Sequence, residues 1–65
     1  MYIAKSTVKK LLKEAGAQRV SDGAARKFQE TLNKIAYDAA SKAAKLSKHA
    51  KRKTVEESDV RLAFQ

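Results

Sequence analysis

The residues with the clearest capacity for chemistry are three consecutive cations at 51–53, which three acids follow within six positions. Lysine and arginine side chains bind the phosphates of nucleic acids. Thr54 and Glu57 match the T-x-x-E capping box, which predicts a helix that starts after Thr54 and runs through Phe64. The acids would then lie in its first turns, where the helix dipole favours negative charge. This explains the acids but not the cations before them.

The sequence contains few residues that could form a catalytic site or a metal site. His49 is the only histidine, and cysteine is absent. No nucleophile–base set or carboxylate pair can be assembled around a single histidine, and a metal site there would need clustered carboxylates. The absence of cysteine excludes disulfides and cysteine-type zinc sites. We therefore expect no enzyme activity, no bound metal and no cofactor.

The charge balance is the strongest global feature. Fifteen Lys and Arg residues against seven Asp and Glu residues give a net charge of +8, and the isoelectric point is about 10.1. So high a density of positive charge favours a polyanionic partner, and nucleic acid is the first candidate. A merely soluble basic protein and a basic helix on a membrane surface, suggested by residues 9–13, are the alternatives. The first residues have no apolar run that suits a signal peptide or a membrane span, so a soluble intracellular protein is expected.

Apolar periodicity predicts helices only. Proline is absent, and the two glycines lie near one short break. The first helix has an apolar face with helical spacing, and Gly16 is a suitable C-terminal stop. The residues of this face are Val8, Leu11, Leu12 and Ala15.

A second, much longer helix is predicted over about residues 22–49. Apolar residues step by three or four from Ala25 to Ala50, and nothing in between breaks a helix. Ser21 or Asp22 is expected to cap its start.

The length of this helix predicts an obligate dimer. It spans on the order of 40 Å, whereas a compact chain of this size has a diameter of roughly 28 Å. Two short flanking helices cannot cover its apolar stripe, so another chain must. The expected dimer core consists of Leu11, Leu12, Phe28, Leu32, Ile35, Ala39 and Leu46.

Two segments, 12–22 and 45–55, make the chain resemble the archaeal histones. The motifs are A-G-A-x-R-V-S-D in the first loop and H-A-x-R-K-T-[VI]-x-x-x-D-[VI] in the second, spaced around the long helix. The resemblance implies an all-α histone fold, in which a short helix, a loop, a long central helix, a loop and a short helix form one domain over residues 1–65. It also implies an intertwined handshake homodimer.

The resemblance implies roles for individual residues. Arg19 would enter the DNA minor groove, and the second loop of one chain would lie beside the first loop of its partner. Arg52 would fix its loop through Asp59, and one dimer would meet another through Leu46, His49 and Asp59. The residues expected to bind DNA are Lys9, Lys10, Lys13, Arg19, Ser21, Lys51, Lys53 and Thr54.

The implied function is architectural. The protein is expected to bind and wrap double-stranded DNA without sequence specificity, in the cytoplasm and on the chromosome (the nucleoid). The alternative is a histone-fold component of a sequence-specific transcription regulator that acts with another partner. Tetramers, larger assemblies on DNA and heterodimers with paralogues are left open. The chain departs from the family at Lys51, where glycine is common, and in its short last helix.

Overall fold

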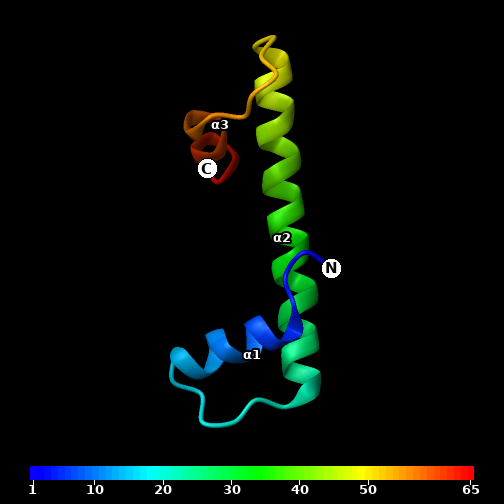
Figure 1. The fold of residues 1–65 in the computed structure, drawn as a ribbon, viewed down its shortest axis with the longest axis vertical. Coiled ribbons are helices and arrows are strands. Elements are labelled where there is room, and N and C mark those ends of the chain that lie inside the picture. The colour runs from blue at the N-terminus through cyan, green and yellow to red at the C-terminus, as the bar shows by residue number, and fades with distance from the viewer. The chain divides into compact units, whose positions relative to one another are not determined.

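The computed structural model describes residues 1–65 and contains three helices and no strand (Figure 1). These are α1 (Lys5–Glu14), α2 (Asp22–His49) and α3 (Glu57–Ala63). The chain divides into two compact units, Met1–Lys34 and Ile35–Gln65, and α2 contributes to both. The predicted order of a short, a long and a short helix is confirmed, as are the bounds of the 28-residue α2. A single domain over residues 1–65 stays a prediction.

In the first unit, α1 ends in a tight glycine turn. The amide of Gly16 donates to the carbonyl of Lys13 at 3.1 Å, and the amide of Ala17 donates to the carbonyl of Leu12 at 3.0 Å. This pair of bonds is the Schellman arrangement, which needs a left-handed residue after the helix. Gly16 supplies that residue with a φ of 121°, so its predicted role as a helix stop is confirmed.

A serine side chain starts α2. The hydroxyl oxygen of Ser21 accepts a hydrogen bond from the amide of Ala24 at 3.1 Å. Of the two caps predicted from the sequence, Ser21 is therefore the one that the structure uses. Val8 of α1 and Ala25 of α2 are both fully buried, and they are the buried apolar residues of the first unit.

Asn33 attaches the N-terminal segment to α2. Its side-chain oxygen accepts from the amide of Ile3 at 2.9 Å, and its amide nitrogen donates to the carbonyl of Ile3 at 3.2 Å. Gln29 donates to the same carbonyl at 3.0 Å. Asn33 is buried, and these bonds satisfy its polar groups. The segment before α1 is therefore held in place by side chains of α2.

In the second unit, α2 also ends in a Schellman arrangement, but with a lysine in place of glycine. The amide of Lys51 donates to the carbonyl of Lys48, and the amide of Arg52 donates to that of Ser47, both at 2.9 Å. Lys51 has a φ of 59°. For a residue with a Cβ atom, this left-handed conformation costs roughly 1–2 kcal/mol.

The predicted start of the last helix is wrong. Thr54 does not cap α3, because the helix begins three residues later at Glu57, with Glu56 as its N-cap. The Asp59 carboxylate accepts a hydrogen bond from the amide of Glu56 at 2.9 Å. The helix also ends at Ala63, one residue before the predicted Phe64.

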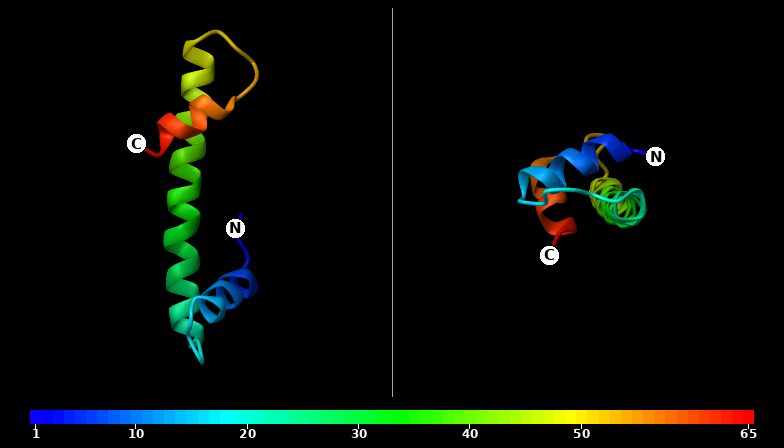
Figure 2. Two further views of the ribbon diagram at one scale, coloured as in Figure 1. Left: turned by 90° about the vertical axis from the view of Figure 1, so that its left-hand side faces the viewer. Right: turned by 90° about the horizontal axis from the view of Figure 1, so that it is seen from below.

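α3 crosses α2 in the second unit (Figure 2), and small residues form the buried contact between them. Ala39 and Ala43 of α2 and Ala63 of α3 form a buried cluster. Across the whole chain the buried apolar residues are these three alanines, Ala25 and Val8. No helix in the chain combines the length and the apolar character that crossing a membrane requires.

Candidate nucleic-acid interface

The loop between α1 and α2 presents Arg19 to solvent on an anchored backbone. Arg19 is exposed, and the turn at Gly16 and the cap at Ser21 fix the chain on either side of it. Lys10 and Lys13 are exposed on α1. Since these three cations are exposed, each can approach a phosphate at little cost in desolvation.

Lys9 differs from the other cations of α1 because an acid lies beside it. The Asp22 carboxylate accepts a hydrogen bond from Lys5 at 2.7 Å and one from Arg26 at 3.1 Å, and Lys9 lies 3.8 Å away. The hydrogen bond from Lys5, followed by its positive charge, lowers the pKa of the Asp22 carboxyl below 3.8. Lys9 is half-buried, so the cluster around Asp22 constrains its side chain, which is not free in solvent.

Lys5 and Arg26 were not among the residues expected near the interface. The spacing of four residues between Asp22 and Arg26 is a sequence signal for their ion pair. Lys5 and Asp22 are 17 positions apart, and no local pattern joins them. Their contact depends on how α1 packs at the start of α2.

The loop between α2 and α3 carries a second set of exposed groups. Lys51, Lys53 and Thr54 are all exposed. Lys51 adopts the left-handed conformation that ends α2. The carbonyl of Thr54 accepts a hydrogen bond from the Arg52 guanidinium at 3.0 Å, which ties the middle of the loop to Arg52.

Arg52 forms a two-pronged ion pair with Asp59. Its guanidinium nitrogens lie 2.9 and 2.8 Å from the two carboxylate oxygens. Asp59 is buried, and Glu56 lies 3.3 Å from the same guanidinium. The hydrogen bond from Arg52, together with that from the amide of Glu56, lowers the pKa of the Asp59 carboxyl to about 2. The ion pair that the resemblance implied is therefore present, and its effect on stability and DNA binding stays a prediction.

Most residues of the expected dimer core are incompletely covered by their own chain. Leu11, Phe28 and Ile35 are 46%, 38% and 52% exposed. Leu12, Leu32 and Leu46 are half-buried, and only Ala39 is buried.

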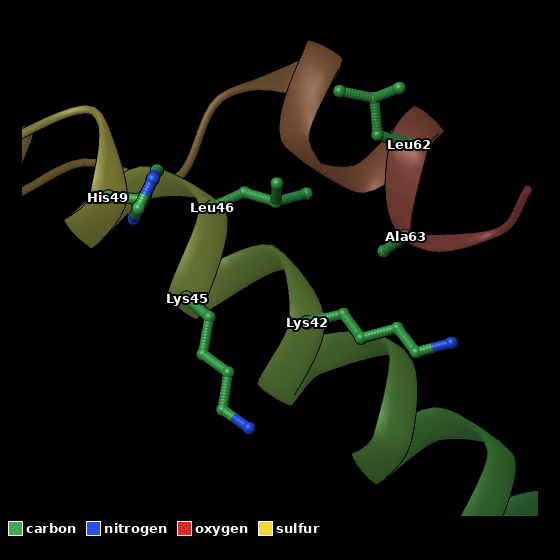
Figure 3. Close-up of a pocket in the computed structure, with 6 residues that line it drawn as sticks. All are labelled: Lys42, Lys45, Leu46, His49, Leu62 and Ala63. Carbon is green, nitrogen blue, oxygen red and sulfur yellow. The ribbon is translucent and has the colours of Figure 1, made fainter.

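Of the three residues expected between dimers, two line one groove, and their role stays a prediction. Leu46 and His49 line this groove, beside Leu62 of α3 (Figure 3). Asp59 does not line this groove, and both of its carboxylate oxygens are occupied by Arg52.

The side-chain chemistry along both loops suits phosphate binding. No three His, Cys, Asp or Glu side chains come together in a way that could hold a metal ion. The exposed groups include ammonium and guanidinium donors and the hydroxyls of Ser21 and Thr54, and groups of these kinds contact phosphate oxygens in protein–DNA complexes.

Comparison with known proteins agrees with this chemistry. The profile of the family described as histone-like transcription factor (CBF/NF-Y) and archaeal histone matches residues 1–64. A protein named probable archaeal histone 3, from Methanocaldococcus jannaschii, is 53% identical over 55 residues, which cover 85% of this chain and 82% of that protein. A component of the archaeal histone HAN1 from Thermococcus zilligii is 45% identical over 56 residues, which cover 86% of this chain and 84% of that protein.

The chain belongs to the family of histone-like transcription factors and archaeal histones. Its three helices form the histone fold, as the sequence predicted. It is a DNA-binding architectural protein of the chromosome and not an enzyme.

Proposed function

We propose that two copies of this chain form a handshake dimer, and that this dimer wraps double-stranded DNA without sequence specificity. The cationic groups of the first loop in one chain then lie beside those of the second loop in its partner. Arg19 enters the minor groove, and Lys51, Lys53 and Thr54 hold the adjacent phosphates. Ser21 and the first amides of α2 add donors for a phosphate at the helix start.

The observation that carries the dimer is the small amount of apolar side chain that a single chain buries. Val8 is the largest side chain that it buries completely. Ile35 on α2 and Phe64 after α3 are 52% and 66% exposed. In the second unit, Val60 and Phe64 line an apolar groove with four alanines of α2, a surface suited to a partner helix. A core of this size rarely supplies more than about 3–5 kcal/mol, so a partner chain that covers the exposed apolar residues would add much of the stability.

Exposed cations on fixed loops support the DNA part of the proposal. Arg19 follows a glycine turn, and Lys51 and Lys53 flank the residue that is paired with Asp59. Because the backbone at these cations is already ordered, little conformational entropy is lost when they meet phosphates. Lys10 and Lys13 extend the same charge along α1.

The description of the family includes transcription factors, so sequence-specific regulation with another partner is the alternative function. Apart from Arg19, the side chains of both loops are proposed to contact phosphates, and phosphate contacts carry no sequence information. This favours the architectural function. A contact of one dimer with another through Leu46 and His49, and heterodimers with paralogues, stay predictions.

Affinity for unrelated duplexes at several salt concentrations tests the proposal. We expect similar affinities for duplexes of different sequence, apart from a preference for flexible or A·T-phased DNA. With about 6–10 phosphate contacts per dimer, the log–log dependence of affinity on salt should have a slope of about −5 to −9. A shallow slope with strong discrimination between sequences would support the regulator instead.

A further inference from the structure

Three cations converge on one carboxylate where α1 meets the start of α2 in the first unit. Lys5 and Arg26 donate hydrogen bonds to the two oxygens of Asp22, at 2.7 and 3.1 Å. Lys9 lies 3.8 Å from the oxygen that Lys5 contacts. Residues from two helices therefore bring their positive charges to one point on the surface.

The cluster carries more positive charge than its carboxylate can balance. Three cations around one acid leave two positive charges uncompensated. The other acids of the first unit, Glu14 and Glu30, take no part in these ion pairs. Between 37% and 63% of each side chain in the cluster is exposed, and exposed ion pairs contribute little to stability. Stability therefore does not account for three cations at this point.

Ordered backbone supports the cations from both helices. Ile3, two residues before Lys5, is hydrogen-bonded to the side chains of Gln29 and Asn33 on α2. Arg26 belongs to α2, so its backbone is helical. Because the backbone at both cations is already fixed, little conformational entropy is lost when they meet an anion.

The cluster continues the cationic side of α1. Lys5, Lys9 and Lys13 follow one another at intervals of four residues, which places them along one side of the helix. Lys13 is exposed and is among the cations already assigned to DNA. A DNA backbone that follows this side of α1 from Lys13 leads to the cluster at Asp22.

We propose that the three cations bind one backbone phosphate of DNA in each chain, and that Asp22 positions them for it. A DNA phosphate carries one negative charge, so the two uncompensated charges can accept it without displacing Asp22. This inference rests on the proposed function, because it extends the same DNA-binding surface. It adds Lys5 and Arg26 to the phosphate ligands, and it makes Asp22 a positioning residue, since Asp22 contacts the cations and not DNA.

Removal of two of the cations tests the phosphate site. The affinity of Lys5→Gln/Arg26→Gln for a duplex of mixed sequence is measured at several salt concentrations, beside that of the wild-type protein. We expect binding in about 50 mM salt to weaken at least about tenfold, and the log–log slope to become less steep by about two, because a dimer loses one phosphate contact in each chain. Tm should change little, since the ion pairs at Asp22 are exposed.

Two further variants separate this site from general attraction. Lys27→Gln/Lys34→Gln loses the same charge at two exposed residues of α2 that form no ion pair, so its slope should stay close to that of the wild type. Lys5→Arg/Arg26→Lys keeps both charges and should retain most of the wild-type slope.

A combination of variants tests the role of Asp22. The factor by which Lys5→Gln/Arg26→Gln weakens DNA binding should be smaller in an Asp22→Asn background, because the cations are no longer held together there. An equal or larger factor would show that the carboxylate does not position the cations for DNA.

The results that would contradict the phosphate site differ from those that would contradict the proposed function. A steep slope in the wild-type protein, with the same slope in Lys5→Gln/Arg26→Gln, would overturn the phosphate site alone. Equal losses in this variant and in Lys27→Gln/Lys34→Gln would show general attraction and no site. Wild-type protein that does not bind DNA would overturn the proposed function as well.

Discussion

The Asp59 carboxylate joins two functions in the second loop, because it accepts hydrogen bonds from the Arg52 guanidinium at 2.9 and 2.8 Å and from the Glu56 amide at 2.9 Å. The first contact joins Arg52 of the loop to α3, and the second lies at the start of α3. Asp59 is only 3% exposed, so water does not replace either contact easily. We therefore expect the acids of this segment to hold the neighbouring cations in place as well as to start a helix.

Removal of either partner should destabilise the dimer. We expect Arg52→Ala and Asp59→Ala each to lower Tm by several degrees, because a buried carboxylate or its loop anchor loses its partner. The double variant should lose less than the sum of the single variants, since both remove the same interaction. Thermal unfolding of the three variants at one protein concentration measures these losses.

Lys53→Ala is the matched control. Lys53 is exposed, so its removal should leave Tm nearly unchanged and reduce the salt slope of DNA binding by about one for each lysine removed. If Arg52→Ala behaves in the same way as Lys53→Ala, Arg52 is a phosphate contact and its pairing with Asp59 does not stabilise the loop.

The ion pair between Arg52 and Asp59 also predicts that the stability of the fold depends on pH. Asp59 has a pKa of about 2 in the folded chain, against an ordinary value of 3.8. A carboxyl with a lowered pKa stabilises the fold above its unfolded pKa, and this contribution disappears as pH falls through the folded value. The difference in Tm between wild type and Asp59→Asn should therefore shrink between about pH 4 and pH 2. A difference that stays constant over this range would show that ionisation of Asp59 does not stabilise the fold.

Replacing Lys51 by glycine should have opposite effects on stability and on DNA binding. Its φ of 59° favours glycine, so Lys51→Gly should raise the free energy of unfolding by roughly 1 kcal/mol per chain. The same change removes a cation from the second loop and should weaken DNA binding. Denaturant unfolding and DNA titration, performed on the same preparation, measure both quantities.

Lys51→Arg separates charge from backbone conformation. It keeps the charge and the strain, so both stability and DNA affinity should stay close to those of the wild type. A Lys51→Gly variant with undiminished DNA affinity would show that the cation does not contact DNA.

The dimer is tested at Ile35, which is half exposed in the single chain. We expect Ile35→Asp to abolish folding, because the partner chain would bury the carboxylate. Lys34→Asp, at the neighbouring exposed position, should remain folded. The Tm of the wild-type protein should rise with protein concentration. A folded Ile35→Asp monomer in sedimentation would rule out the proposed interface.

The sequence predicted α2 well because local signals agree along its whole length. Its apolar residues recur without a break, and Ser21 supplies a capping hydroxyl at one end. The stop at Gly16 was equally predictable, since glycine is favoured in the left-handed position after a helix.

The start of α3 was less predictable because two capping patterns overlap. Thr54 and Glu57 match one pattern, and Glu56 and Asp59 lie two residues further on. The second position allows Asp59 to accept both the Glu56 amide and the Arg52 guanidinium, and this added ion pair favours it. The contact of Lys5 with Asp22 depends on packing between α1 and α2, which no local pattern contains.

Nuclease digestion of DNA reconstituted with the pure protein tests the architectural function most directly. We expect protected fragments on DNA of any sequence, with a regular ladder if dimers assemble side by side. Arg19→Ala/Lys53→Ala should remove this protection, because it deletes a cation from each loop. Digestion identical to that of free DNA, or protection confined to one short sequence, would contradict sequence-independent wrapping.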